Sequence, residues 1–254
     1  MNLNSEFSGD WSRRTVTHPR SLAAALCSPD AVSQILEQIT AAFEKRPDVA
    51  NVLHGQRRIR QGGKGRRTAL FASKKSGGAV PVESKLELAH AVALERSPTV
   101  LRFRTQAIQI ALTERTFACP DFLVEVAGGT FEIHEVKPSI VNLTGDERHR
   151  FERIEHTLRP LGIGFRLIDA RTLASGYDLN ELLLCYTRGH AIRYSPAEIS
   201  LASDILTSKK PVSFSEAYQL LKSNDLPAGL GDFLNFHGVW SSSRARALRM
   251  EKPS

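Results

Sequence analysis

The feature that most constrains the fold of this chain is a pair of β-rich segments, residues 117–126 and 131–137, on either side of Ala127-Gly128-Gly129. Two such runs around a glycine-containing turn predict a β-hairpin. Glycine suits the bulged position of a three-residue loop, where the backbone φ angle is positive. A mixed arrangement of helices and strands is expected to surround this hairpin.

The hairpin brings two acidic side chains and one basic side chain to one end. Glu135 and Lys137 lie two apart and therefore face the same side of their strand. Asp121 shares that side only if it pairs with Glu135, which a three-residue loop allows and a two-residue Gly128-Gly129 loop does not. Two carboxylates and an ammonium so placed suit a Mg²⁺ ion and a scissile phosphate. The alternative is a surface salt bridge between Glu135 and Lys137.

A third carboxylate is expected from the preceding segment. Residues 83–96 contain strong helix formers without Gly or Pro, and Ser97-Pro98 follows as a stop signal. This predicts a helix with Glu83 and Glu87 on one face, at four-residue spacing. Either residue is a candidate ligand, and both are equally compatible with solvated helix charges, because periodicity does not choose between them.

The rest of the chain predicts an α/β fold. One or two amphipathic helices are expected within 21–45, a charged helix at 146–159, a strand at 165–168 and a helix near 178–185. Together they indicate a mixed sheet flanked by helices. A domain boundary is placed near residue 190, before two helices that begin with the capping-box spacing at Ser195 and Ser213.

The charge of the chain favours a polyanionic partner. The net charge is +7, and segment 57–82 is basic and rich in glycine. Such a run is either a solvated linker or a DNA-contacting arm. Because it leads directly into the predicted site, DNA contact is the favoured interpretation. The candidate DNA-binding residues are Arg57, Arg58, Arg60, Lys64, Arg66, Arg67, Lys74 and Lys75.

Other classes of protein fit the sequence poorly. No stretch approaches the roughly 20 apolar residues of a membrane span, and the N-terminus lacks the basic and apolar parts of a secretory signal. A cytoplasmic location without membrane partners is therefore expected. The three cysteines are far apart and form no CxxC pair, which argues against a disulfide framework or a zinc site.

Several short motifs lie between residues 57 and 170; they are FASKK at 71–75, SKLE at 84–87, SPTV, TQAI, CPDFLVEV, EVKPS and GFRLIDA. Together they resemble the motifs of TnsA, the endonuclease subunit of heteromeric cut-and-paste transposases, within the PD-(D/E)xK restriction-endonuclease-like superfamily. Gln106 matches the family's Gln-Pro, although Ala107 replaces the proline here.

The resemblance implies a site and a function. It selects Glu87 over Glu83, together with Asp121, Glu135 and Lys137, as catalytic residues. The three carboxylates are the implied ligands of Mg²⁺, for which Mn²⁺ is expected to substitute. Members of the family cut the 5′ strands at transposon ends in double-stranded DNA, alongside a partner transposase and an AAA+ regulator.

These inferences divide the chain into four parts. They are a helical N-terminal region (1–56), the basic arm (57–82), a restriction-endonuclease-like nuclease domain (83–189) and a C-terminal helical or winged-helix-like module (190–254). Two alternatives remain open at this point. One is a stand-alone restriction or repair nuclease with the same site, and the other is a non-catalytic DNA-binding adaptor.

Overall fold

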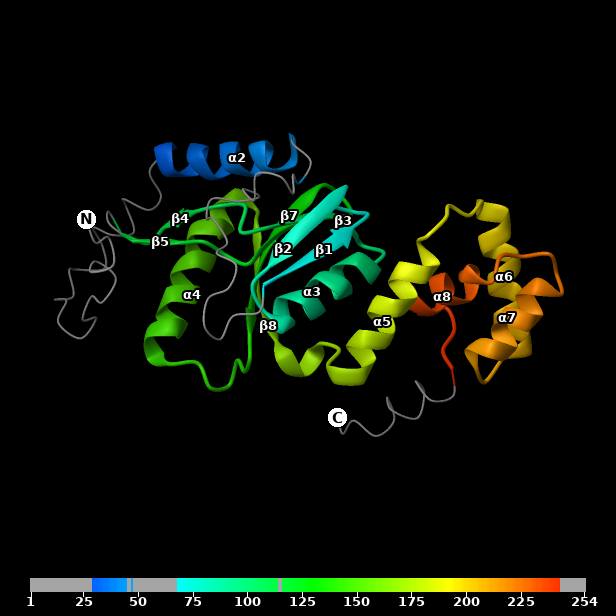
Figure 1. The fold of residues 1–254 in the computed structure, drawn as a ribbon. Helices are drawn as coiled ribbons and strands as arrows, with labels where there is room; N and C mark the ends of the chain where they lie inside the picture. The colour runs from blue at the N-terminus through cyan, green and yellow to red at the C-terminus, as the bar shows by residue number, and fades with distance from the viewer. Residues whose placement is uncertain (1–28, 45–46, 48–67, 114–115, 243–254) are drawn as a thin grey trace, which may run out of the picture.

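A four-stranded mixed sheet forms the centre of the computed structural model, which describes residues 29–44, 47, 68–113 and 116–242 (Figure 1). The strand order is β3 (Val100–Thr105), β6 (Phe122–Val126), β7 (Thr130–Lys137) and β8 (Gly164–Asp169). The first three strands are antiparallel neighbours, and β8 runs parallel to β7. Parallel neighbours need a crossover connection, which contains α4 (Gly145–Leu158). The mixed α/β class is therefore confirmed.

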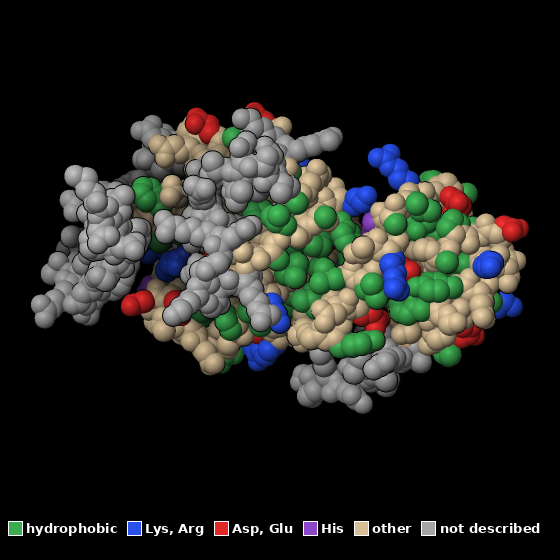
Figure 2. All heavy atoms as spheres, viewed as in Figure 1, with side chains coloured by type: hydrophobic (Ala, Val, Ile, Leu, Met, Phe, Trp, Pro, Cys, Tyr) green, Lys and Arg blue, Asp and Glu red, His purple; other side chains and the backbone are tan. Residues whose placement is uncertain are grey.

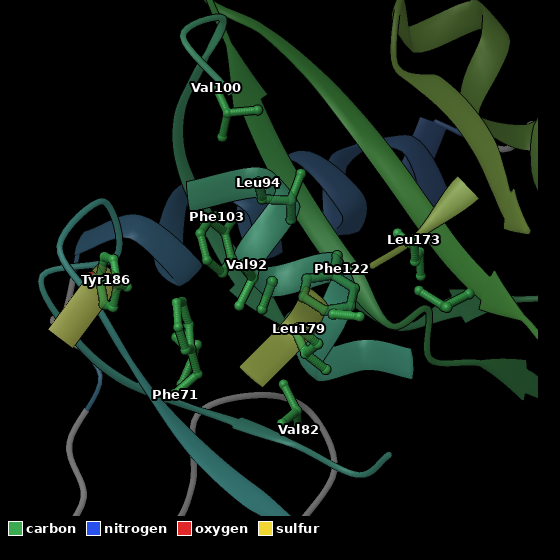
Figure 3. Close-up of a cluster of buried hydrophobic side chains, with 14 of the residues drawn as sticks. Phe71, Val82, Val92, Leu94, Val100, Phe103, Phe122, Leu173, Leu179 and Tyr186 are labelled. Atoms are coloured by element: carbon green, nitrogen blue, oxygen red, sulfur yellow. The ribbon is translucent and has the colours of Figure 1, made fainter. Parts of the chain in front are cut away.

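Helices cover both faces of the sheet, because successive strand residues point to opposite sides. Phe122 packs in a buried cluster with side chains of α3 (Lys85–Arg96) and α5 (Gly176–Gly189), which Figure 3 shows in close-up. Leu123 belongs to a second cluster with α4 and α2 (Pro29–Glu44) on the other face. The layered arrangement predicted from the sequence is confirmed.

The hairpin β6–β7 has the predicted register. Val126 pairs with Thr130, so the loop contains three residues, and Phe122 pairs with His134. Gly128 and Gly129 have φ angles of 94° and 76°. A Cβ atom on either glycine would meet nothing within 4 Å, so it is the backbone conformation that favours glycine at these positions.

α3 begins two residues later than the sequence predicts. The Ser84 side chain caps the helix by accepting a hydrogen bond of 3.1 Å from the backbone N–H of Glu87. Glu83 precedes this cap and lies outside the helix. The expectation that Glu83 and Glu87 share one helical face is therefore wrong, since i,i+4 spacing applies only within a helix.

Part of the expected basic arm is instead a folded hairpin. β1 (Ala69–Ser73) pairs with β2 (Gly78–Val82), and Phe71, Val80 and Val82 are buried in the same cluster as α3. The folded domain thus includes residues 69–82, which the sequence had assigned to the arm. The two strands have five residues each and are separated by a turn that contains Lys74-Lys75. The alternation of buried and exposed side chains was therefore too short to be recognised within a basic segment.

Short elements complete this part of the chain. α4 ends near Pro160, and Gly162 follows with a φ angle of 68°, as expected from the Pro and Gly signals there. The remaining elements are β4 (Ile110–Ala111), β5 (Phe117–Ala118), and the 3-10 helices η2 (Arg159–Leu161) and η3 (Ala170–Thr172).

Residues 190–242 form a helical unit. Its helices are α6 (Pro196–Lys209), α7 (Phe214–Lys222) and α8 (Gly229–Phe236). Ser195 and Ser213 cap α6 and α7 as predicted, each accepting from the N–H of the Glu three residues later. No strand occurs between 190 and 242, so of the two forms expected for this module the described residues show the helical one, without a wing.

This unit is joined to the α/β domain through α5. α5 and α8 cross closely at Gly189, where a Cβ atom would lie only 2.5 Å from the backbone nitrogen of Phe233.

Hydrophobic side chains also reach the surface of the unit (Figure 2). Among the helices that the structure describes, none is both long and apolar enough to cross a membrane.

Candidate active site

Asp121 and Glu135 meet at one end of the β6–β7 hairpin. Asp121 directly precedes β6, and the observed register, continued by one residue, places it opposite Glu135. The backbone N–H of Val136 donates a hydrogen bond of 2.8 Å to Asp121 Oδ2. Asp121 thus lies on the same side of the hairpin as Glu135, as the three-residue loop predicts.

Glu135 and Lys137 project from β7 toward the face covered by α4. Lys137 Nζ lies 3.1 Å from Glu135 Oε1, and it also lies 5.2 Å from the centre of the Phe151 ring on α4. The Glu135 side chain is almost fully buried, whereas about a fifth of the Lys137 side chain is exposed. The ion pair is thus more enclosed than the surface salt bridge that the sequence left open as an alternative.

Glu87 approaches this end of the sheet from the first turn of α3. It is buried, with 8% exposure, and it accepts hydrogen bonds from Glu83 N–H (2.8 Å) and the Ser84 hydroxyl (3.0 Å). Glu87 is thus held near the site by the cap of its own helix.

The electrostatics link these acidic groups. Burial, followed by the negative charge of Glu135, raises the pKa of Asp121 from 3.8 to about 7. Glu87 raises this pKa further, whereas the Val136 N–H and Lys137 lower it. A buried carboxyl group whose pKa is raised by an acidic neighbour is a candidate functional group.

This pKa shift predicts that the metal-free protein loses stability as pH rises from about 4 to about 7. In that range the folded state keeps a proton on Asp121 that the unfolded state has released, so raising the pH favours unfolding. Urea unfolding in EDTA at pH 5 and pH 8 measures the effect. Asp121→Asn should remove this part of the pH dependence, and an unchanged dependence in that variant would assign it to other groups.

The donor atoms match a hard divalent cation in kind and charge. Mg²⁺ prefers oxygen ligands, which Asp121, Glu135 and Glu87 supply. Glu135 Oε2 is buried without a hydrogen-bond partner. As the side chains stand, however, no group of three or more His, Cys, Asp or Glu side chains among the described residues has metal-binding geometry.

Gln106 lies beside this site and has an unusual backbone. It is 1% exposed, its φ angle is 49°, and its N–H donates a hydrogen bond of 2.9 Å to the carbonyl of Asp121. A positive φ is uncommon for a residue other than glycine and is often found near functional sites. β3 ends just before it at Thr105, so Gln106 and Ala107 form the exit from this strand.

Most of the predicted DNA-binding residues lie outside the described part of the chain; these are Arg57, Arg58, Arg60, Lys64, Arg66 and Arg67. Lys74 is exposed in the β1–β2 turn. Lys75 Nζ instead donates to the carbonyls of Leu94 (2.9 Å) and Ser97 at the C-terminal end of α3. The ammonium group of Lys75 thus caps the C-terminal end of α3, and its contact with DNA stays a prediction.

The sequence did not single out His90, which lies in α3 three residues after Glu87. Its ring contacts His134, the residue before Glu135, on the face of β7 opposite to the Glu135 side chain. The available signal was the spacing of His90 from Glu87 on a predicted helix, which is too weak to identify a partner in a distant strand.

In comparisons with known proteins, no family model and no curated protein matches this sequence.

Proposed function

We propose that this chain is a magnesium-dependent DNA endonuclease of the PD-(D/E)xK type. The observation that carries the proposal is the meeting of Asp121, Glu135 and Lys137 at one end of a hairpin, where burial and then the charge of Glu135 raise the pKa of Asp121. The mixed sheet with helices on both faces supports a restriction-endonuclease-like fold.

Each residue has a defined role in this proposal. Asp121, Glu135 and Glu87 would hold Mg²⁺, or Mn²⁺ in its place, and an ion held there would supply water activation and positive charge beside the phosphate. Lys137 orients the attacking water and adds positive charge beside the phosphate. Its position is held by Glu135 and by the Phe151 ring. Asp121 must lose its proton before it can act as a ligand.

The biological reaction we propose is cleavage of the 5′ strands at transposon ends, as the resemblance to TnsA suggests. A partner transposase would cut and join the 3′ ends, with an AAA+ regulator controlling the assembly in the cytoplasm. This part of the proposal rests on the motifs around SKLE, PDF and EVK, because the site chemistry is common to many nucleases.

The test is to look for a transposase gene beside this one, to copurify its product with the chain, and to map cleavage on labelled transposon-end DNA with Mg²⁺. Cuts at the 5′ ends that require the partner would support the transposition role. Cuts made by the chain alone, without regard to transposon ends, would favour a stand-alone nuclease. No cleavage with either Mg²⁺ or Mn²⁺, while DNA is bound, would favour a non-catalytic adaptor.

Removing the charges of Arg57, Arg58, Arg66 and Arg67 is expected to weaken DNA binding and to flatten its salt dependence. The slope of log affinity against log salt should fall by about 0.9 for each phosphate that the variant no longer neutralises. A salt titration with fluorescent DNA measures this slope. The matched control replaces the same four residues with lysine, which keeps the charge and should keep the slope. Equal slopes for the alanine and lysine variants would identify the segment as a linker.

A further inference from the structure

A chain of polar side chains runs from α3 through β7 to β8, and it is buried at its two histidines and more exposed at Glu132 and Arg166. His90 Nε2 lies 2.9 Å from His134 Nδ1, and His134 Nε2 lies 2.9 Å from Glu132 Oε2. Arg166 Nε on β8 lies 3.5 Å from the same Glu132 oxygen. His90 and His134 are only 4% and 3% exposed. Each of these side chains thus holds a neighbour on another element.

The partners determine which atoms donate in this chain. The Glu132 carboxylate only accepts, so His134 Nε2 must carry the donated proton. In the imidazole tautomer that carries its proton on Nε2, the other ring nitrogen accepts. His134 Nδ1 is then an acceptor, and His90 Nε2 donates to it. The hydrogen bonds therefore run in one direction, from α3 to Glu132.

The chain lies where the elements bearing the three carboxylates meet. His90 follows Glu87 by three residues in α3, and His134 directly precedes Glu135 in β7. The His90 ring also packs edge-on against Phe122, the residue after Asp121, with centroids 4.9 Å apart. A single side chain thus touches the neighbours of both Asp121 and Glu135 from the helix that carries Glu87.

From this geometry we infer that the His90–His134–Glu132 chain is a positioning device, which sets the distance between the helix carrying Glu87 and the hairpin carrying Asp121 and Glu135. The inference rests on the proposed metal-dependent function. It assigns no ligand role to either histidine, because both lie on the face of β7 opposite to Glu135 and Lys137.

Packing alone does not require these groups. A buried polar network is often no more stable than apolar side chains of the same volume, and here His90 Nδ1 is left without a hydrogen-bond partner. A directed hydrogen bond between helix and strand does, however, fix their separation more narrowly than apolar contact does. Groups that orient metal ligands in this way typically change metal affinity about 10–100-fold when removed.

The test is the Mn²⁺ affinity of the full chain, measured by calorimetry, with urea unfolding recorded on the same samples. His90→Leu should bind Mn²⁺ at least about 10-fold more weakly than the parent chain. His90→Gln keeps an N–H donor near the Nε2 position and should restore most of the affinity. His190→Leu is the matched control, because His190 pairs with His237 at the junction of α5 and α8; its Mn²⁺ affinity should match the parent.

A folded His90→Leu variant with the parent's Mn²⁺ affinity would overturn the inference and leave the proposed function standing. If the parent chain binds no Mn²⁺ and cleaves no DNA, the proposed function itself fails. Should His90→Leu not fold, Glu132→Ala decides, because it removes the acceptor of His134 from a side chain that is 23% exposed. Its affinity should fall below that of Glu125→Ala, a variant of the neighbouring strand, and equal affinities would overturn the inference.

Discussion

Replacing Asp121 or Lys137 with alanine is expected to lower strand cleavage by about 10²–10⁴-fold while leaving the fold and DNA affinity nearly unchanged. Asp121 loses a proposed ligand, and Lys137 loses the charge beside the phosphate. Neither side chain belongs to the hydrophobic clusters that hold the sheet to its helices. Cleavage of labelled DNA with the partner transposase and Mg²⁺, alongside filter binding and circular dichroism, measures all three properties.

The matched controls for these two variants are Asp204→Ala and Lys209→Ala, which remove exposed charges of the same kinds from α6. Both controls should cleave at the parent rate. Wild-type cleavage by Asp121→Ala would show that the assigned site is wrong. If Lys137→Ala reduced cleavage only in proportion to its weaker DNA binding, its role would be substrate affinity and not positioning of water.

Glu95→Ala is expected to lower the free energy of unfolding by about 3–4 kcal/mol, because buried donors left without an acceptor cost about 1–3 kcal/mol each. Glu95 is 3% exposed, and its carboxylate accepts from the Ser73 hydroxyl, the Tyr186 hydroxyl and the backbone N–H groups of Lys74 and Lys75. It thus ties the β1–β2 turn to α3 and α5. Urea unfolding monitored by circular dichroism measures the loss.

Glu95→Gln keeps one acceptor oxygen and should lie between the parent and the alanine variant. Glu152→Ala, on the exposed side of α4, should change the unfolding free energy by less than about 0.5 kcal/mol. If Glu95→Ala also lowered the unfolding free energy by less than about 0.5 kcal/mol, water would be replacing the carboxylate as the partner of these donors. The hairpin would then be held chiefly by the burial of Phe71, Val80 and Val82.

Local interactions let the sequence alone determine much of this protein. The period of two in a strand and the length of the 127–129 loop place Asp121 opposite Glu135, and the loop glycines adopt the positive φ angles such a turn requires. The caps at Ser195 and Ser213 were readable for the same reason, since each hydrogen bond joins residues three apart.

Only the tertiary structure decided the features that depend on contacts between distant segments. The capping of α3 by Lys75 joins residues 19 and 22 positions apart, and the basic segment around Lys75 did not predict it. The segment around Phe71 becomes a hairpin because α3 and the sheet bury it, which outweighs the basic composition around it. The His90–His134 contact spans 44 residues, and no local pattern specifies it. Periodicity determines which way a side chain points, whereas the packing of helices on the sheet determines what it meets.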